Sequence, residues 1–161
     1  MNSDPFRAKR VTKTYCQTIE ASPGQVFPLL CPVREAEWLD GWEYTMIYSE
    51  SGLVEEGAVF TTPSGDEPDT VWVVTRHDPV ERIVEFARVT HGSRACLLRA
   101  VVRPKEPGRS AVDVSYTYTG LTAAGNAFID NLTEESFLRA VTFWERSMNH
   151  WLATGERLRR G

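Results

Sequence analysis

Residues 133–158, TEESFLRAVTFWERSMNHWLATGERL, decide the fold of this chain. Large apolar residues recur there at steps of three and four, and at 3.6 residues per turn such residues form one stripe of a helix. The stripe comprises Phe137, Leu138, Val141, Trp144, Met148, Trp151 and Leu152. Thr133 is the expected N-cap, because its hydroxyl can accept a hydrogen bond from a free N–H of the first turn. A stripe with two tryptophans needs a broad apolar partner, so the sequence predicts a helix over residues 133–158 that packs on a sheet.

Residues beside this stripe carry three further expectations. Arg157, Arg159 and Arg160 are expected at the C-terminal end of the helix, where positive charge is favourable. Glu145 lies at the edge of the stripe and is expected to contribute little to stability. Phe143 falls outside the stripe, so it is either an exposed side chain without a role or part of a homodimer contact.

Most of the chain before residue 120 is typical of short strands separated by turns. The predicted strands are residues 11–20, 43–50, 58–62, 69–77, 82–90, 95–103 and 110–119. Two short helices are expected between the first two strands, and a further short helix or kinked lead-in is expected between residues 120 and 132. Because the connections between later strands are short, successive strands are expected to pair antiparallel. The prediction is a single α+β domain over residues 1–161.

The composition is that of an ordinary globular protein and argues against several kinds of partner. With 161 residues, of which 42% are hydrophobic, the chain can bury a core of its own. Its net charge of −4 argues against nucleic acid and against an acidic membrane surface. No segment approaches the roughly 20 apolar residues of a membrane span. The N-terminal residues lack the apolar region of a signal peptide, and the three cysteines are expected to be reduced, so a cytoplasmic location is expected.

No motif for metal, phosphate or covalent chemistry is visible in the sequence. His77, His91 and His150 are scattered, and no pair of them has the spacing of metal ligands. A Gly-rich phosphate loop and a nucleophile elbow are both absent from the sequence. We therefore predict no metal, no cofactor and no catalytic residue.

One stretch carries a resemblance to a known superfamily. It is LCPVREAEWLDGW (residues 30–42), followed by YSESG (48–52) and GAVFTT (57–62). Together with the order of elements, these segments resemble a bacterial branch of the START / SRPBCC superfamily, which includes polyketide-cyclase-like and birch-pollen-allergen-like proteins. The resemblance covers nearly the whole chain. It implies a helix-grip fold, in which a seven-stranded antiparallel sheet curls around a long C-terminal helix and encloses a cavity.

The register of the central strands can be argued from charge. Residues 82–90 carry one charge on each face, so alternation alone does not orient this strand. Placing Glu85 on the outer face sets it opposite Arg99, and such a cross-strand pair is favourable. Arg88 then points inward and lies beside Cys96 and Tyr118 of the next two strands.

This register predicts a pocket between the sheet and the helix. Arg88 is either an anchor for an anion or carbonyl, or an arginine whose stem packs while its head reaches water. Trp38 and Trp42 either flank the mouth of the cavity or plug the core, and Trp72 cannot be placed. The candidate ligand-binding residues are Arg88, Tyr118, Tyr116, Phe86, Leu98, Trp38, Trp42 and Trp144.

Three functions fit these features. The first is binding of a small hydrophobic or aromatic-acid ligand in the cavity. The second is a cyclase or dehydratase in which Arg88 polarises a carbonyl and Glu37, Tyr116 or Tyr118 transfers a proton. In this interpretation Glu35 and Glu37 point apart on their short helix. The third is a protein-interaction module that uses Arg99, Arg103 and Asp113 on the outer face of the sheet.

Overall fold

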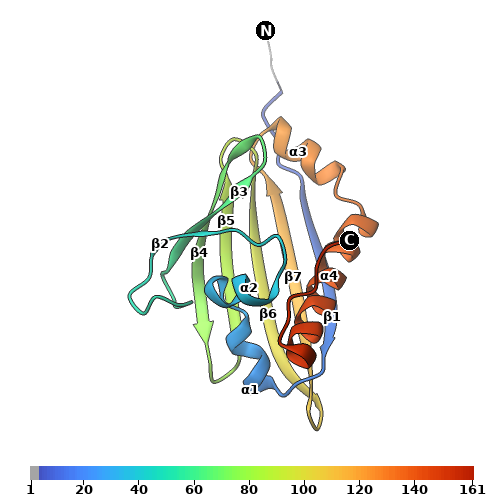
Figure 1. Cartoon of the computed structure of the whole chain (residues 1–161). Coiled ribbons are helices and arrows are strands. Elements are labelled where there is room, and N and C mark those ends of the chain that lie inside the picture. The colour runs from blue at the N-terminus through green and yellow to red at the C-terminus, as the bar shows by residue number, and fades with distance from the viewer. Residues whose placement is uncertain (1–3) are drawn as a thin grey trace.

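The computed structural model describes residues 4–161 and has a seven-stranded antiparallel sheet at its centre (Figure 1). The strands are β1 (Arg10–Ile19), β2 (Thr45–Tyr48), β3 (Val59–Ser64), β4 (Glu67–Asp78), β5 (Ile83–Thr90), β6 (Arg94–Glu106) and β7 (Arg109–Gly120). Their order in the sheet is β1-β7-β6-β5-β4-β3-β2, so β1 and β2 form the two edges and the sheet does not close. The predicted α+β helix-grip fold is confirmed.

Strand β2 is shorter than the sequence predicts. It ends at Tyr48, because the following residues form a loop around the carboxylate of Glu55. That carboxylate accepts hydrogen bonds from the backbone N–H of Glu50 and Ser51 and from the hydroxyl of Ser49. The side chain of Ser51, together with these bonds, lowers the pKa of Glu55 from its ordinary value to about 2.

Helix α4 (Glu134–Thr154) lies against the inner face of the sheet (Figure 1). The hydroxyl of Thr133 accepts a 3.0 Å hydrogen bond from the backbone N–H of Ser136, as expected of an N-cap. The predicted end at residue 158 is wrong: Gly155 has a φ of 73° and ends the helix, because this left-handed conformation suits glycine. The arginines after Gly155 therefore belong to a separate C-terminal segment, residues 156–161, and not to the last turn of the helix.

Helices α1 (Pro23–Val26) and α3 (Ala123–Asp130) lie at opposite ends of the sheet, and α2 (Pro32–Trp38) lies over its inner face (Figure 1). Helix α1, the 3-10 turn η1 (Phe27–Leu29) and helix α2 follow one another between β1 and β2. Helix α3 is separate from α4 and packs beside β7. Gly125 lets α3 approach the turn between β5 and β6 closely, since a Cβ atom there would lie 1.7 Å from the carbonyl oxygen of Ser93.

The apolar stripe of α4 faces the core as predicted. Phe137, Val141 and Met148 are at most 4% exposed, and the other stripe residues pack against them. Glu145 departs from the expectation of a minor role, because its carboxylate accepts hydrogen bonds from the hydroxyl of Tyr15 and the backbone N–H of Thr18. Glu145 thus fastens edge strand β1 to α4.

The predicted register of the central strands is also correct. Glu85 lies opposite Arg99, with 3.2 Å between Oε1 and Nε. On the other face Arg88 is paired with Cys96, which in turn is paired with Tyr118.

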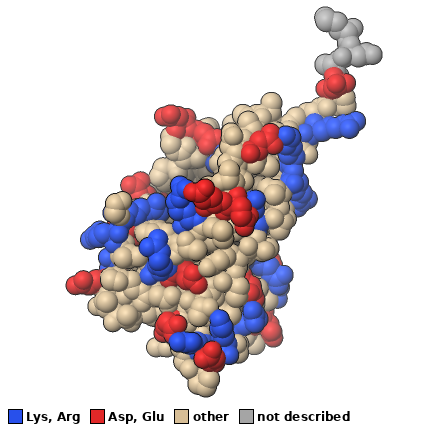
Figure 2. Space-filling model, turned by 90° about the vertical axis from the view of Figure 1, so that its right-hand side faces the viewer, with Lys and Arg blue, Asp and Glu red and all other residues tan. Residues whose placement is uncertain are grey.

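Charges of both signs are interspersed over the face of the molecule seen in Figure 2, so no single-sign patch marks a nucleic-acid surface there. None of the helices within residues 4–161 is long and apolar enough to cross a membrane.

Candidate functional site

A pocket of about 560 Å³ lies between the inner face of the sheet, helix α2 and helix α4. This volume falls within the range of small-molecule sites in proteins. Its lining is mostly apolar and aromatic: Leu30, Pro32, Trp38, Leu39, Trp42, Phe60, Trp72, Val84, Phe86, Leu98, Ala100, Tyr116, Ala140, Phe143, Trp144 and Leu158. The charged residues of the lining are Glu35, Arg88, Arg139, Arg146, Arg159 and Arg160.

Four aromatic side chains form one wall of this pocket. Trp72 and Phe60 are stacked, with 5.1 Å between ring centroids, and Phe86 meets both of them edge to face. Trp42 meets Trp72 edge to face at 6.0 Å. The indole N–H of Trp72 donates to the hydroxyl of Thr62, so that its ring is held both by stacking and by a hydrogen bond. The result is a rigid aromatic surface with few free polar groups.

Arg88 lies among aromatic rings at the end of this wall. Its Cζ atom is 4.9 Å from the ring centroid of Trp72, 5.5 Å from that of Tyr116 and 5.6 Å from that of Tyr118. Its Nη2 donates a 2.8 Å hydrogen bond to the hydroxyl of Tyr118. Within residues 4–161 no carboxylate lies within ion-pair distance of Arg88, whereas Arg94, Arg99 and Arg103 of the next strand each pair with a carboxylate. A partly buried guanidinium without a counter-ion is suited to an anionic or carbonyl ligand.

The groups beside Arg88 are neutral at physiological pH. Burial raises the pKa values of the Tyr116 and Tyr118 hydroxyls and of the Cys96 thiol, and the neighbouring positive charge of Arg88 only partly offsets this. Neither the tyrosines nor the cysteine therefore supplies the missing negative charge.

Glu35 is the one acidic side chain of the lining. It lies on α2 between Pro32 and Trp38, which occupy the same face of this helix at three-residue spacing. Burial raises the pKa of Glu35 to about 8. In the described part of the chain its carboxyl group has neither a hydrogen-bond donor nor a cation within ion-pair distance.

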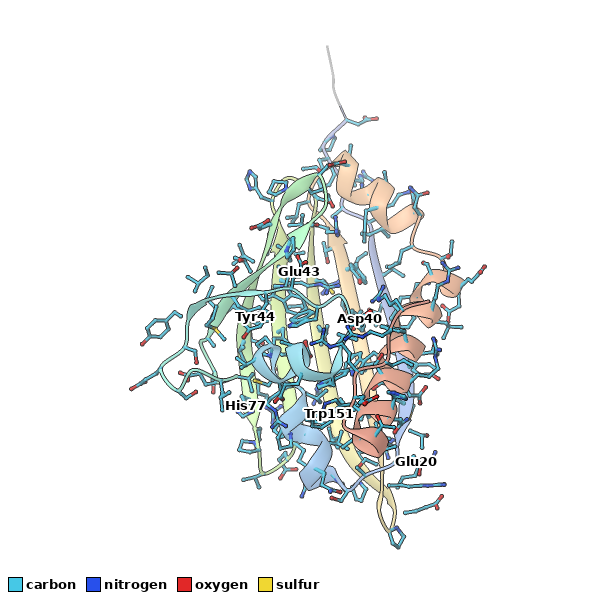
Figure 3. The ribbon with its side chains drawn as sticks, viewed as in Figure 1. Glu20, Asp40, Glu43, Tyr44, His77 and Trp151 are labelled. Atoms are coloured by element: carbon cyan, nitrogen blue, oxygen red, sulfur yellow. The ribbon has the colours of Figure 1, made fainter. Side chains whose placement is uncertain are left out.

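The C-terminal segment covers the pocket beside α2. Leu158 forms an isolated parallel β-bridge with Leu39, which directly follows α2. The carboxylate of Asp40 accepts hydrogen bonds from the Arg159 side chain, at 3.3 Å, and from the Arg160 backbone N–H, at 3.0 Å. Figure 3 shows Asp40 between α2 and this segment. Arg157 adds a hydrogen bond to the carbonyl oxygen of Ala36.

Phe143 is not the exposed aromatic that the sequence predicts. It is partly buried in the pocket lining, and the Cζ atom of Arg160 lies 4.4 Å from its ring centroid. Because the Phe143 side chain is not exposed, there is no longer a reason to expect a homodimer contact at this residue.

Seven of the eight predicted ligand-binding residues line the pocket, namely Arg88, Tyr116, Phe86, Leu98, Trp38, Trp42 and Trp144. Tyr118 is the exception: it lies behind Arg88, against Cys96 and Ile129, and holds the guanidinium from that side. Trp38 is fully buried and donates to the carbonyl of Leu29, so it belongs mainly to the core. Trp42 is partly buried and forms part of the wall.

Sequence reasoning missed Glu35, Trp72 and the C-terminal segment. The face of α2 shared with Pro32 and Trp38 could have identified Glu35 as inward-pointing. Trp72 carried no such signal, because Val71 and Val73 give its strand apolar residues on both faces. The structure shows Val71 and Val73 exposed on the outer face and Trp72 only 7% exposed on the inner one.

No protein-family model and no curated protein matches the sequence, whereas solved structures match the fold. Norcoclaurine synthase from Thalictrum flavum, in complex with dopamine and hydroxybenzaldehyde, has a TM-score of 0.67 at 11% identity, over 91% of this chain and 88% of its own. Ara h 8.0201 has a TM-score of 0.59 at 12% identity, over 91% of this chain and 99% of its own. DynU16, a protein in the dynemicin biosynthetic locus, has a TM-score of 0.56 at 18% identity, over 94% of this chain and 49% of its own.

At these identities the likeness concerns the fold and leaves ligand and activity open. The shared features are an antiparallel seven-stranded sheet, a long C-terminal helix and short helices after the first strand. This chain therefore has the helix-grip fold, which it shares with these three members of the SRPBCC/Bet v 1-like superfamily.

Proposed function

We propose that this protein binds a small aromatic or hydrophobic molecule carrying a carboxylate or carbonyl group in the pocket between the sheet and α4. The observation that carries the proposal is the unpaired guanidinium of Arg88 within an aromatic wall. A bidentate donor in a poorly hydrated pocket favours a planar anion or carbonyl more strongly than the same donor in water. Trp72, Phe60 and Phe86 offer faces and edges to an aromatic ring of the ligand.

The comparison with norcoclaurine synthase supports the same class of ligand. That enzyme has the same fold and was solved with dopamine and hydroxybenzaldehyde, which are small aromatic compounds. Three further arginines of the lining, Arg139, Arg146 and Arg160, add long-range attraction for an anionic ligand.

The alternative of an interaction module has less support. The charged residues of the outer face pair with one another, since Arg103 contacts Asp113 at 2.5 Å and Arg99 contacts Glu85 at 3.2 Å. Those charges are already satisfied without a partner protein.

The proposal is tested by calorimetric titration with cinnamate and phenylacetate and with the amides of both acids. Arg88→Met keeps the packing of the stem and removes the charge, so it is expected to weaken the acids by about 1–3 kcal/mol and the amides far less. Arg99→Met, on the outer face, is the matched control and should bind like the wild type. Equal affinities of the wild type and Arg88→Met for acids and amides would exclude an anchoring role.

A further inference from the structure

Glu35 differs in its surroundings from the other acid of the same short helix. Glu37, which the sequence offers as a proton-transferring residue, is exposed, lies outside the pocket lining and forms an ion pair with Arg34, with 2.5 Å between Oε2 and Nε, so that expectation is wrong. Glu35 is partly buried, faces the pocket and has no partner for its carboxyl group within residues 4–161. Holding an acidic group in such a place without a partner costs stability, so its position points to a role toward whatever enters the pocket.

The other charged and titratable groups that line the pocket with Glu35 come from four elements. Arg88 belongs to β5, Tyr116 to β7, Arg139 and Arg146 to α4, and Arg159 and Arg160 to the C-terminal segment. Tyr116 lies close enough that the charge of Glu35 contributes to its raised pKa, although burial is the larger cause. The same Tyr116 ring contacts the guanidinium of Arg88. Glu35 and Arg88 thus face one compartment, with Tyr116 beside both.

Burial keeps the carboxyl group of Glu35 largely protonated at neutral pH, because its pKa is raised to about 8. A group with a pKa near the operating pH exchanges protons most effectively in both directions. Glu35 can therefore both donate a proton and, once ionised, accept one.

We propose that Glu35 is a general acid–base catalyst that transfers a proton on a carbonyl compound whose oxygen is held by Arg88. This inference rests on the proposed function and names the reaction class of the same pocket. The Glu35 carboxylate takes a proton from the carbon next to the carbonyl, and the C–H electron pair forms the C=C bond of an enolate. The negative charge moves to the carbonyl oxygen, where Arg88 stabilises it. The carboxylic acid then returns the proton to carbon or, in a β-hydroxy carbonyl compound, to the hydroxyl group, which leaves as water.

Phenylpyruvate in D₂O is a direct probe, since it combines an aromatic ring, a carboxylate, a carbonyl and an exchangeable CH₂ group. Loss of the CH₂ signal is followed by NMR above the buffer rate, and binding is followed by tryptophan fluorescence. We expect the wild type to accelerate exchange, and Glu35→Gln to lose on the order of 100-fold of that rate while phenylpyruvate affinity is retained. Glu37→Gln, on the same helix, should behave as the wild type. The rate should rise with pH through about 8, because the step requires ionised Glu35.

The outcomes separate the two proposals. If the wild type binds phenylpyruvate without accelerating exchange, or Glu35→Gln exchanges as fast as the wild type, the catalytic role of Glu35 is overturned and the binding function stands. If the wild type does not bind phenylpyruvate, the proposed function fails for aromatic keto acids, and the role of Glu35 fails with it.

Discussion

The guanidinium group of Arg88 on β5 donates a 2.8 Å hydrogen bond to the hydroxyl of Tyr118 on β7, across the intervening strand β6. Cys96 of β6 is small enough to leave this path open, and it is the register partner of both residues. The bond fixes one side of the guanidinium and leaves the other side toward the pocket, which Tyr118 itself does not line. Arg88 is therefore oriented before a ligand arrives.

A double-mutant cycle measures how much the hydrogen bond between Arg88 and Tyr118 contributes to the free energy of unfolding. Tyr118→Phe removes only the hydroxyl and is expected to cost about 1–2 kcal/mol, because the bond involves a charged donor. In an Arg88→Met background the same substitution should cost almost nothing, since the donor is gone. Urea unfolding of the four proteins gives the coupling. An equal cost of Tyr118→Phe in both backgrounds would mean that the hydroxyl stabilises the fold without Arg88.

The stripe of α4 provides a second prediction on stability. Phe137→Ala should cost about 3–5 kcal/mol, as large-to-small aromatic changes in cores do. Glu135→Ala, on the exposed face of the same helix, should cost well under about 1 kcal/mol, because its ion pair with Arg139 is solvated. Equal shifts of the two urea midpoints would contradict the packing of the stripe.

The loss of stability caused by Glu145→Ala is expected to lie between those caused by Phe137→Ala and Glu135→Ala. Its carboxylate bonds Tyr15 and the Thr18 backbone N–H, so its removal leaves an edge-strand donor unpaired and should cost about 1–3 kcal/mol. Glu145→Gln, which keeps one acceptor oxygen, should recover part of this loss in the same urea experiment. A loss no larger than that of Glu135→Ala would restore the minor role that the sequence predicts for Glu145.

The sequence was sufficient for the stripe because its apolar residues repeat at helical spacing, and for the register because of one charge pair. A shift of one residue in β5 would turn Glu85 inward in place of Arg88 and separate it from Arg99, so the Glu85–Arg99 pair selects the observed register. The position of Arg88 beside Cys96 and Tyr118 follows from that register alone.

The rest of the site depends on tertiary contacts that leave no local signal. The end of α4 at Gly155 and the return of residues 156–161 over the pocket depend on Asp40 and Leu39, more than 110 residues away. Trp72 has apolar neighbours on both faces of its strand, and only its stacking on Phe60 distinguishes the inner one. The sequence wrongly places Tyr118 in the pocket lining, because the register tells on which face of the sheet a side chain lies but not how far the pocket extends along that face.

Glu35 predicts a characteristic pH dependence of stability. Its pKa in the folded protein, about 8, lies above its ordinary value of 4.5. The stability that depends on a neutral carboxyl is therefore fully present below pH 4.5 and is lost as pH rises through about 8. Glu35→Gln stays neutral, so it should match the wild type at about pH 4.5 and be more stable by about 1–3 kcal/mol near pH 9. Urea unfolding at both pH values, with Glu37→Gln as control, decides this. A Glu35→Gln variant less stable than the wild type at the higher pH would mean that ionised Glu35 has a stabilising partner.

The last prediction concerns the attachment of the C-terminal segment. Asp40→Asn removes the charge that meets the Arg159 side chain and the Arg160 backbone N–H, and hydrogen exchange of residues 157–160 should become faster. Global stability should change little, because an ion pair with an exposed partner such as Arg159 contributes little. Asp130→Asn is the matched control. Asp130 lies at the end of α3, away from the pocket lining, and the substitution removes the charge of its exposed 2.7 Å pair with Lys9. Since Leu158, Arg159 and Arg160 line the pocket, a looser segment should also raise the association and dissociation rates of a ligand such as cinnamate in stopped-flow fluorescence. If hydrogen exchange is unchanged in Asp40→Asn, the segment is held by the Leu39–Leu158 bridge and by the Arg157 bond to Ala36 instead. If exchange becomes faster but the ligand rates stay the same, the segment does not control entry of the ligand to the pocket.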